Sequence, residues 1–141
     1  MSEELNIVHI EKPEESAWGI IGRGLQAFNE EQAGPSNFNR VCFALQTAEH
    51  EIVGGILGEI YWGWFYVDLL WVKEELRGNG HGHRLLARAE EEARQLGAQY
   101  AYLDTFSFQV PDFYKQHGYR VFGELQDFPP GHQRYFMTKQ L

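Results

Sequence analysis

The sequence predicts a mixed α/β fold, in which a mostly antiparallel sheet of about seven strands has a central parallel pair and helices on both faces. Seven apolar runs indicate the strands, and three of them follow one another closely as a meander over residues 40–72. A helical pattern then joins the runs 64–72 and 99–106, and such a crossover connects parallel strands. We expect a single domain over residues 1–141.

The first 36 residues predict one strand and one helix. The run LNIVHI (5–10) predicts the first strand. Spacings of three, four and three residues predict one apolar helical face, made by Trp18, Ile21, Leu25 and Phe28. Gly34-Pro35 ends this helix, and the glycines at 19, 22 and 24 leave open a break inside it.

The remaining elements follow from apolar periodicity and turn residues. The meander consists of strands at 40–48, 51–61 and 64–72. The helix that comes next ends before Gly97, and its apolar face consists of Leu85, Ala89, Ala93 and Leu96. The chain continues with a strand at 99–106, a short helix at 111–117, and strands at 119–125 and 134–141.

Charge and composition argue against several classes of partner. Residues 1–72 contain 11 acidic and 3 basic side chains, whereas residues 73–141 contain 9 of each, so nucleic acid is not an expected partner. No apolar run reaches about 18 residues, and the N-terminus does not resemble a signal peptide, so we expect neither a membrane partner nor export. Cys42 lies in an apolar run and is predicted to be a buried thiol in a reducing, cytoplasmic compartment.

The stretch RGNGHG (77–82) stands between a predicted strand and a predicted helix. The N–H groups of a helix's first turn have no partner inside the helix, and glycines let the backbone approach an anion closely, so this corner is suited to binding phosphate. No lysine followed by Ser or Thr is present, which argues against a P-loop. His83 stands where a dinucleotide fingerprint needs its third glycine, which argues against an NAD(P)H-dependent oxidoreductase.

The corner matches the pattern R-x-x-G-x-G, and FYKQHGY (113–119) matches a second pattern, F/L-Y-x-x-x-G-F/Y. Together they resemble the coenzyme A loop and the later tyrosine signature of the GNAT superfamily of N-acetyltransferases. The resemblance covers residues 40–141 by motif and 1–39 by the order of elements. It implies a GNAT-like fold with acetyl-CoA as the acyl donor and no metal.

The resemblance also implies positions for the coenzyme. Leu70 and Val72 would offer backbone groups to the pantetheine arm. The pyrophosphate would be held by the corner residues Arg77, Gly78, Asn79, Gly80, His81 and Gly82. Ser107 stands where the family often has an asparagine that binds the coenzyme. Arg84 or Arg88 is a candidate for the adenosine phosphate, with a solvated helix face as the alternative.

Residues for proton transfer and acceptor binding are predicted near the end of the parallel pair. The resemblance makes Tyr114 the candidate general acid for the leaving thiolate. Asp68 is the first candidate base and shares a face with Leu70 and Val72 by alternation, Glu59 is the second, and a water chain is the alternative. The acceptor-binding candidates are Asp104 and Thr105, at the end of a strand, and His132, in a loop.

We therefore expect an N-acetyltransferase that moves the acetyl group to a primary amine by direct attack in a ternary complex. Aromatic residues beside carboxylates suit a small organic cation such as a polyamine, an amino sugar or an amine-bearing antibiotic. A protein amine as acceptor, and a non-catalytic acetyl-CoA-binding sensor or interaction module, stay open. The final strands are of a kind that can pair between subunits, so a homodimer also stays open.

Overall fold

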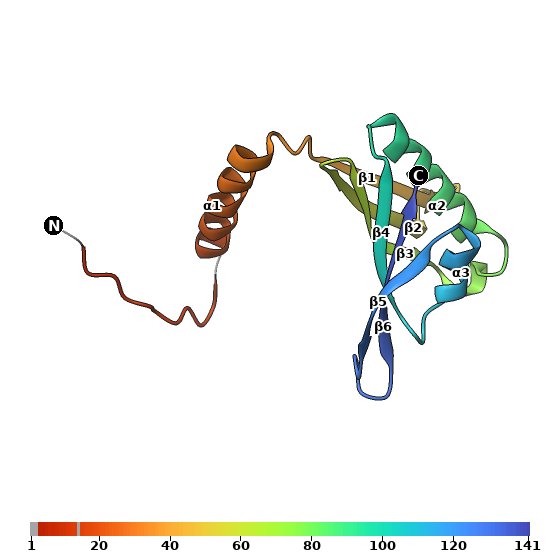
Figure 1. The fold of residues 1–141 in the computed structure, drawn as a ribbon. Coiled ribbons are helices and arrows are strands. Elements are labelled where there is room, and N and C mark those ends of the chain that lie inside the picture. Colours follow the sequence, from red (N-terminus) through yellow and green to blue (C-terminus); the bar gives the residue numbers. More distant parts are fainter. Residues whose placement is uncertain (1–2, 14) are drawn as a thin grey trace. The chain divides into compact units, whose positions relative to one another are not determined.

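The computed structural model describes residues 3–13 and 15–141 (Figure 1). The chain divides into two compact units, one over Met1–Ser36 and one over Asn37–Leu141, which are described separately. Within the described residues no helix combines the length and the apolar character that crossing a bilayer requires.

The first unit contains the predicted helix, α1 (Glu15–Ala33), as one uninterrupted element. Its three internal glycines do not break it. The helix ends at Gly34, which has a φ of 83° and donates its backbone N–H to the Glu30 carbonyl at 2.8 Å. The side chains of the predicted apolar face are 59–75% exposed, and they are Trp18, Ile21, Leu25 and Phe28.

The strand predicted at 5–10 is wrong. These residues form no strand, and the side chains of Leu5 and Ile7 are 87% and 105% exposed. A strand exists only where a neighbouring strand pairs with its N–H and C=O groups, and no described residue does so here. The run of apolar residues indicated a tendency to form a strand, but the described chain supplies no strand to pair with it.

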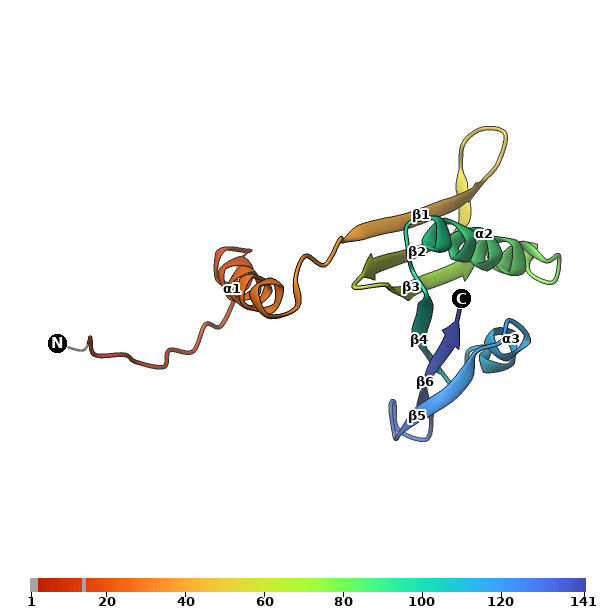
Figure 2. The ribbon, with the colours of Figure 1, turned by 45° about the horizontal axis from the view of Figure 1, so that its top comes forward.

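The second unit is built on a six-stranded sheet in the order β1-β2-β3-β4-β6-β5 (Figures 1 and 2). The strands are β1 (Asn39–Gln46), β2 (Ile52–Tyr61), β3 (Trp64–Val72), β4 (Tyr100–Phe106), β5 (Arg120–Gln126) and β6 (Gln133–Gln140). The pair β3–β4 is parallel and the other pairs are antiparallel, which confirms the predicted mixed sheet. The sheet has six strands instead of about seven because residues 5–10 do not take part.

Helix α2 (His81–Gln95) is the crossover between the parallel strands, and it packs across β1, β2 and β3 (Figure 2). Leu86, Ala89 and Ala93 on its inner face are completely buried against the sheet. Leu96, predicted to share that face, is 40% exposed because the helix ends before it. A helix layer on the second sheet face stays a prediction, since α1 belongs to the other unit.

The parallel strands pair over only part of their length. Trp64–Val67 lies beside Tyr100–Leu103, and the pairing then stops although β3 continues to Val72 and β4 to Phe106. The short helix α3 (Pro111–Gln116) follows β4. The end of the pair is therefore open, and the candidate residues lie around it.

Candidate functional site

The glycine corner presents main-chain donors at the start of α2. A 3₁₀ turn (Glu74–Leu76) ends β3, and both Gly78 and Gly80 have a φ of 82°, a conformation that glycine adopts without strain. The N–H of Arg84 donates to the Gly80 carbonyl at 3.1 Å. Among the described residues, the N–H groups of residues 78–83 have no acceptor, so the predicted anion-binding geometry is present.

Two corner side chains brace the loop itself. The Asn79 side-chain amide donates to the Leu76 carbonyl at 3.1 Å. The Arg77 Nε donates to the Val72 carbonyl at 2.9 Å and so ties the loop to the end of β3. The Val72 carbonyl, predicted to face the pantetheine arm, therefore already accepts a bond from within the loop.

The basic side chains farther along α2 have local partners. The Arg84 guanidinium contacts the ring of His81 in the first turn of the helix. The guanidinium of Arg88 lies over the ring of Phe43 on β1, 5.1 Å from its centroid. Arg88 thus packs on the sheet, whereas Arg84 stays beside the corner.

A cavity of about 420 Å³ adjoins the corner. It is lined by the first turn of α2, the end of β4 and α3, through His83, Ser107, Gln109, Val110, Pro111, Asp112, Phe113 and Gln116. Ser107 lines this cavity; its Oγ accepts the N–H of Gln133 at 3.0 Å and keeps its own proton for another acceptor. The cavity is large enough for part of an extended cofactor arm.

Tyr114 on α3 packs against the hydrophobic core. Burial raises the pKa of its hydroxyl to about 12, and the negative charge of Asp104 adds to the effect. The hydroxyl has no hydrogen-bond partner among the described residues. Tyr114 is therefore protonated at neutral pH, which is the state that a proton donor requires.

An irregularity in strand pairing sets the position of Asp68. Leu57 on β2 pairs with Leu69, but the next residue, Gly58, pairs with Val67, so Asp68 is an extra residue on β3. Asp68 is exposed, whereas Leu70 and Val72 pack against the core. The prediction that these three side chains share one face is wrong, because the extra residue interrupts the alternation.

Asp68 and Glu59 line one cavity of about 290 Å³, together with Arg40, Val41, Cys42, Leu57 and Gly58. Within the described part of the chain, neither carboxylate has a hydrogen-bond or ion-pair partner. The structure thus brings the two candidate bases together on neighbouring strands. Cys42 is exposed rather than buried, because Val41 is the residue of this pair that faces the core.

Asp104 is held by two residues that sequence reasoning did not select. The Arg134 guanidinium lies 2.7 and 2.9 Å from its Oδ1, and the Tyr66 hydroxyl donates to its Oδ2 at 3.2 Å. Burial raises the pKa of Tyr66 to about 12, and the charges of Asp104 and Asp68 add to the effect. Tyr66 could have been predicted to lie near Asp68, because it precedes it by two residues on the same strand. Arg134 could not, because β6 comes to lie beside β4 only in the folded chain.

Two predicted acceptor residues do not face the opening. Thr105 is 3% exposed, and its hydroxyl donates to the Gln109 side-chain oxygen at 3.0 Å. It points away from the Asp104 side because neighbouring strand residues face opposite sides of the sheet. His132 lies between β5 and β6 with its ring against Phe108, and no described contact joins it to the carboxylates or to Tyr114.

Aromatic side chains continue from Tyr66 along β3 and β4. The rings of Tyr66 and Tyr102 stack with centroids 4.9 Å apart, and those of Trp64 and Tyr100 stack at 4.8 Å. The hydroxyls of Tyr102 and Tyr61 are hydrogen-bonded at 2.9 Å. Aromatic faces therefore lie next to the carboxylates, as predicted for binding an organic cation.

Comparison with known proteins gives consistent matches. The family model described as "Acetyltransferase (GNAT) family" matches residues 7–119. A blasticidin-S acetyltransferase from Streptomyces morookaense is 44% identical over 92 residues, which cover 64% of this chain and 68% of that protein. The acetyltransferase Atu2258 from Agrobacterium fabrum (strain C58) is 32% identical over 136 residues, which cover 96% of this chain and 99% of that protein.

A solved structure agrees over nearly the full length. The crystal structure of an acetyltransferase from Bacillus cereus ATCC 14579 has a TM-score of 0.85 and 34% sequence identity. The match covers 95% of this chain and 98% of that one.

Proposed function

Because this chain belongs to the GNAT family of acetyltransferases, we propose that it moves the acetyl group of acetyl-CoA to a primary amine of a small cationic molecule. Attack is direct, in a complex that holds both substrates. The family makes the chain an acyl-CoA-dependent N-acetyltransferase; the acetyl-CoA donor, the direct attack, and the amine with its charge are the proposal.

The unpaired main-chain donors of the glycine corner carry this proposal. Six consecutive residues, 78–83, offer N–H groups without acceptors in the described chain, at the positive end of α2. A diphosphate supplies the negative charge and the acceptor oxygens that this arrangement lacks. The adjoining cavity then has room for the pantetheine arm on its way toward Tyr114.

The reaction needs proton transfer at two places. The neutral amine nitrogen attacks the thioester carbon, a C–N bond forms, and the C–S bond breaks. The departing sulfur takes the hydroxyl proton of Tyr114. The amine gives up its proton to Asp68 or Glu59, directly or through water. The tyrosine then regains a proton from solvent, and the carboxylic acid releases one to solvent, so the enzyme returns to its starting state. The products are an amide and free coenzyme A.

The acceptor is cationic because the cavity beside β3 carries an excess of negative charge, with two carboxylates and one guanidinium, that of Arg40, in its lining. Arg134 neutralises Asp104, whereas Asp68 and Glu59 have no such partner among the described residues. The aromatic rings that start at Tyr66 favour a cation further. The relative from Streptomyces, which by its name acetylates blasticidin S, is in keeping with an antibiotic as one such acceptor.

The full chain is tested with acetyl-CoA and a panel of amines. The panel contains blasticidin S, spermidine, glucosamine and a lysine-containing peptide, and acetyl-CoA without an amine measures background hydrolysis. Free thiol and product mass are followed. We expect thiol release and a mass gain of one acetyl group with at least one small cationic amine.

The other outcomes contradict the proposal in different ways. Turnover with the peptide alone would identify a protein amine as the acceptor. Calorimetric binding of acetyl-CoA without turnover across a broad panel would favour a non-catalytic binding module. Absence of acetyl-CoA binding would remove the corner from the site altogether.

A further inference from the structure

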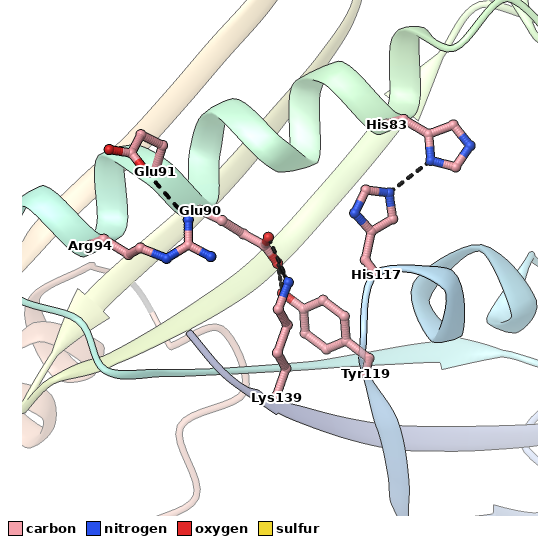
Figure 3. Close-up of polar contacts among 7 residues, drawn as sticks. All are labelled: His83, Glu90, Glu91, Arg94, His117, Tyr119 and Lys139. Carbon is pink, nitrogen blue, oxygen red and sulfur yellow. Dashed lines mark hydrogen bonds and ion pairs between the residues drawn. The ribbon is translucent and has the colours of Figure 1, made fainter.

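Helix α3, which carries Tyr114, and the residues that directly follow it are attached to α2 by three contacts. Gly82 allows the first, because a Cβ there would lie 3.3 Å from the ring of Phe113. The rings of His83 and His117 make the second, with Nδ1 and Nε2 2.7 Å apart (Figure 3). The third lies two helical turns farther along α2, at Glu90. One face of α2 thus contacts α3 and the residues that follow it.

The third contact is a buried group of three side chains (Figure 3). Glu90 on α2 is 3% exposed, and Lys139 on β6 places its Nζ 2.8 and 3.0 Å from the two carboxylate oxygens. The hydroxyl of Tyr119 donates to the Glu90 Oε2 at 2.7 Å. Every member has a partner, so the carboxylate is held in place from both β6 and the residue that precedes β5.

The ring of Tyr119 packs in turn against the ring of Tyr114. The two rings meet edge to face, with centroids 5.9 Å apart and planes at 79°. The backbone N–H of Tyr119 donates to the Tyr114 carbonyl at 3.1 Å. Because the Tyr114 hydroxyl has no hydrogen-bond partner among the described residues, packing against such neighbours sets its position.

We propose that Glu90, held by Lys139, positions Tyr114 through Tyr119. Glu90 and Tyr119 touch neither substrate; they hold the ring next to the proton donor. The inference rests on the proposed function, in which Tyr114 protonates the leaving thiolate. It explains why a carboxylate and an ammonium group are buried together behind α3, where apolar side chains would pack as well.

A double-mutant cycle between Tyr119→Phe and Tyr114→Phe tests the inference. Tyr119→Phe keeps the ring and removes only the bond to Glu90. We expect kcat to fall about tenfold, because a small displacement of a reacting group slows the chemical step, while the KM and the calorimetric affinity for acetyl-CoA stay unchanged. In the Tyr114→Phe background, adding Tyr119→Phe should cause no further loss of kcat.

The control is Glu91→Gln, on the same helix. Glu91 is exposed and pairs with Arg94 rather than with the buried group, so its variant should keep the wild-type kcat (Figure 3). If Tyr119→Phe does not fold, the same cycle is run with the double variant Glu90→Gln/Lys139→Met, which removes the carboxylate and the ammonium charge together and leaves Tyr119 an amide oxygen as acceptor. This neutral oxygen accepts a weaker hydrogen bond, so the loss of kcat should be smaller and still absent in the Tyr114→Phe background.

The outcomes separate this inference from the proposed function. An unchanged kcat in Tyr114→Phe removes Tyr114 as the acid, and the inference falls with it. A lowered kcat in Tyr114→Phe with normal kcat in Tyr119→Phe overturns the inference alone. Full additivity, or a loss of acetyl-CoA affinity in Tyr119→Phe, also overturns it, because either result indicates a general structural role.

Discussion

Asp68 takes its place from one irregularity in the pairing of two strands. Regular alternation would have placed its carboxylate beside Leu70 and Val72, which pack against the core. A lone buried carboxylate is costly, so the extra residue moves the charge to the open side, next to Glu59. The bulge therefore creates a pair of available carboxylates where the parallel strands separate.

Replacing Asp68 by asparagine tests whether this charge serves the acceptor. Asp68→Asn keeps the shape and removes the charge. We expect kcat/KM for a cationic amine to fall about tenfold, which corresponds to roughly 1.4 kcal/mol, with unchanged affinity for acetyl-CoA. Steady-state kinetics at low and high salt measures it, and the loss should shrink at high salt.

Glu49→Gln, in the turn between β1 and β2, is the matched control because it removes the same charge away from the cavity. An equal loss in both variants would show a non-specific effect of net charge. Unchanged kinetics in Asp68→Asn would place the acceptor elsewhere.

Helix α2 has a glycine with positive φ just outside each end, and the two serve different purposes. Gly80 has a φ of 82° and opens the helix toward the unpaired N–H groups. Gly97 has a φ of 94° and closes it, so that the Ala98 N–H can donate to the Ala93 carbonyl at 2.9 Å. A Cβ added at either position would meet no neighbouring atom within 4 Å, so both substitutions extend into open space.

Because both glycines have a positive φ, the pair provides a controlled test of the coenzyme corner. Gly80→Val and Gly97→Val each force a branched side chain into a left-handed conformation and should each lower the free energy of unfolding by about 1–2 kcal/mol. Only Gly80→Val should abolish acetyl-CoA binding by calorimetry, because it distorts and covers the donors. Retained affinity in Gly80→Val, or equal loss in both variants, would contradict the role of the corner.

The buried group of Glu90, Tyr119 and Lys139 links α2 to β6 and to the segment between α3 and β5. Side-chain exposure is 4% for Glu90 and 16% for Lys139, so water screens this ion pair poorly. Such a pair adds little net stability over an apolar substitute, but removing one partner leaves a buried charge without compensation. Its value to the protein is then the defined position of the residues that it joins.

Chemical denaturation of the wild type, a single variant and a triple variant tests whether the buried group contributes position more than stability. Glu90→Leu alone should lower the free energy of unfolding by about 3–5 kcal/mol, because Lys139 loses its partner. The triple variant Glu90→Leu/Tyr119→Phe/Lys139→Met removes every polar member and should recover most of that stability. Its kcat should nevertheless stay low. A triple variant as unstable as the single one would contradict the argument.

Two predictions concern the whole molecule, namely its domain organisation and its assembly. The single domain over 1–141 and the homodimer stay predictions. The apolar face of α1 is exposed within the first unit, and light scattering on the full chain would show whether its mass in solution exceeds the 16.4 kDa of one copy.

Local features of the fold were predictable from the sequence. The bounds of β3 agree with the predicted 64–72, and Gly97 ends α2 as predicted. In the acidic run AEEEAR, helical spacing places Glu90 at the edge of the apolar face of α2 and Glu91 on the opposite side, so the pattern could have singled out Glu90. The partner could not be predicted, because only the packing of α2 against the sheet brings Glu90 to Lys139 on β6.

The candidate site likewise has features that the sequence predicts and features that only the fold decides. The corner could be recognised because its donors, glycines and arginine follow one another in the chain, and their conformations depend on local dihedral angles. The sequence could not predict which carboxylate is neutralised, which threonine is buried or which tyrosine faces Asp104, because strand register and burial decide these properties. Those properties arise from contacts between residues far apart in the chain, such as Asp104 with Arg134, and a linear pattern contains no record of them.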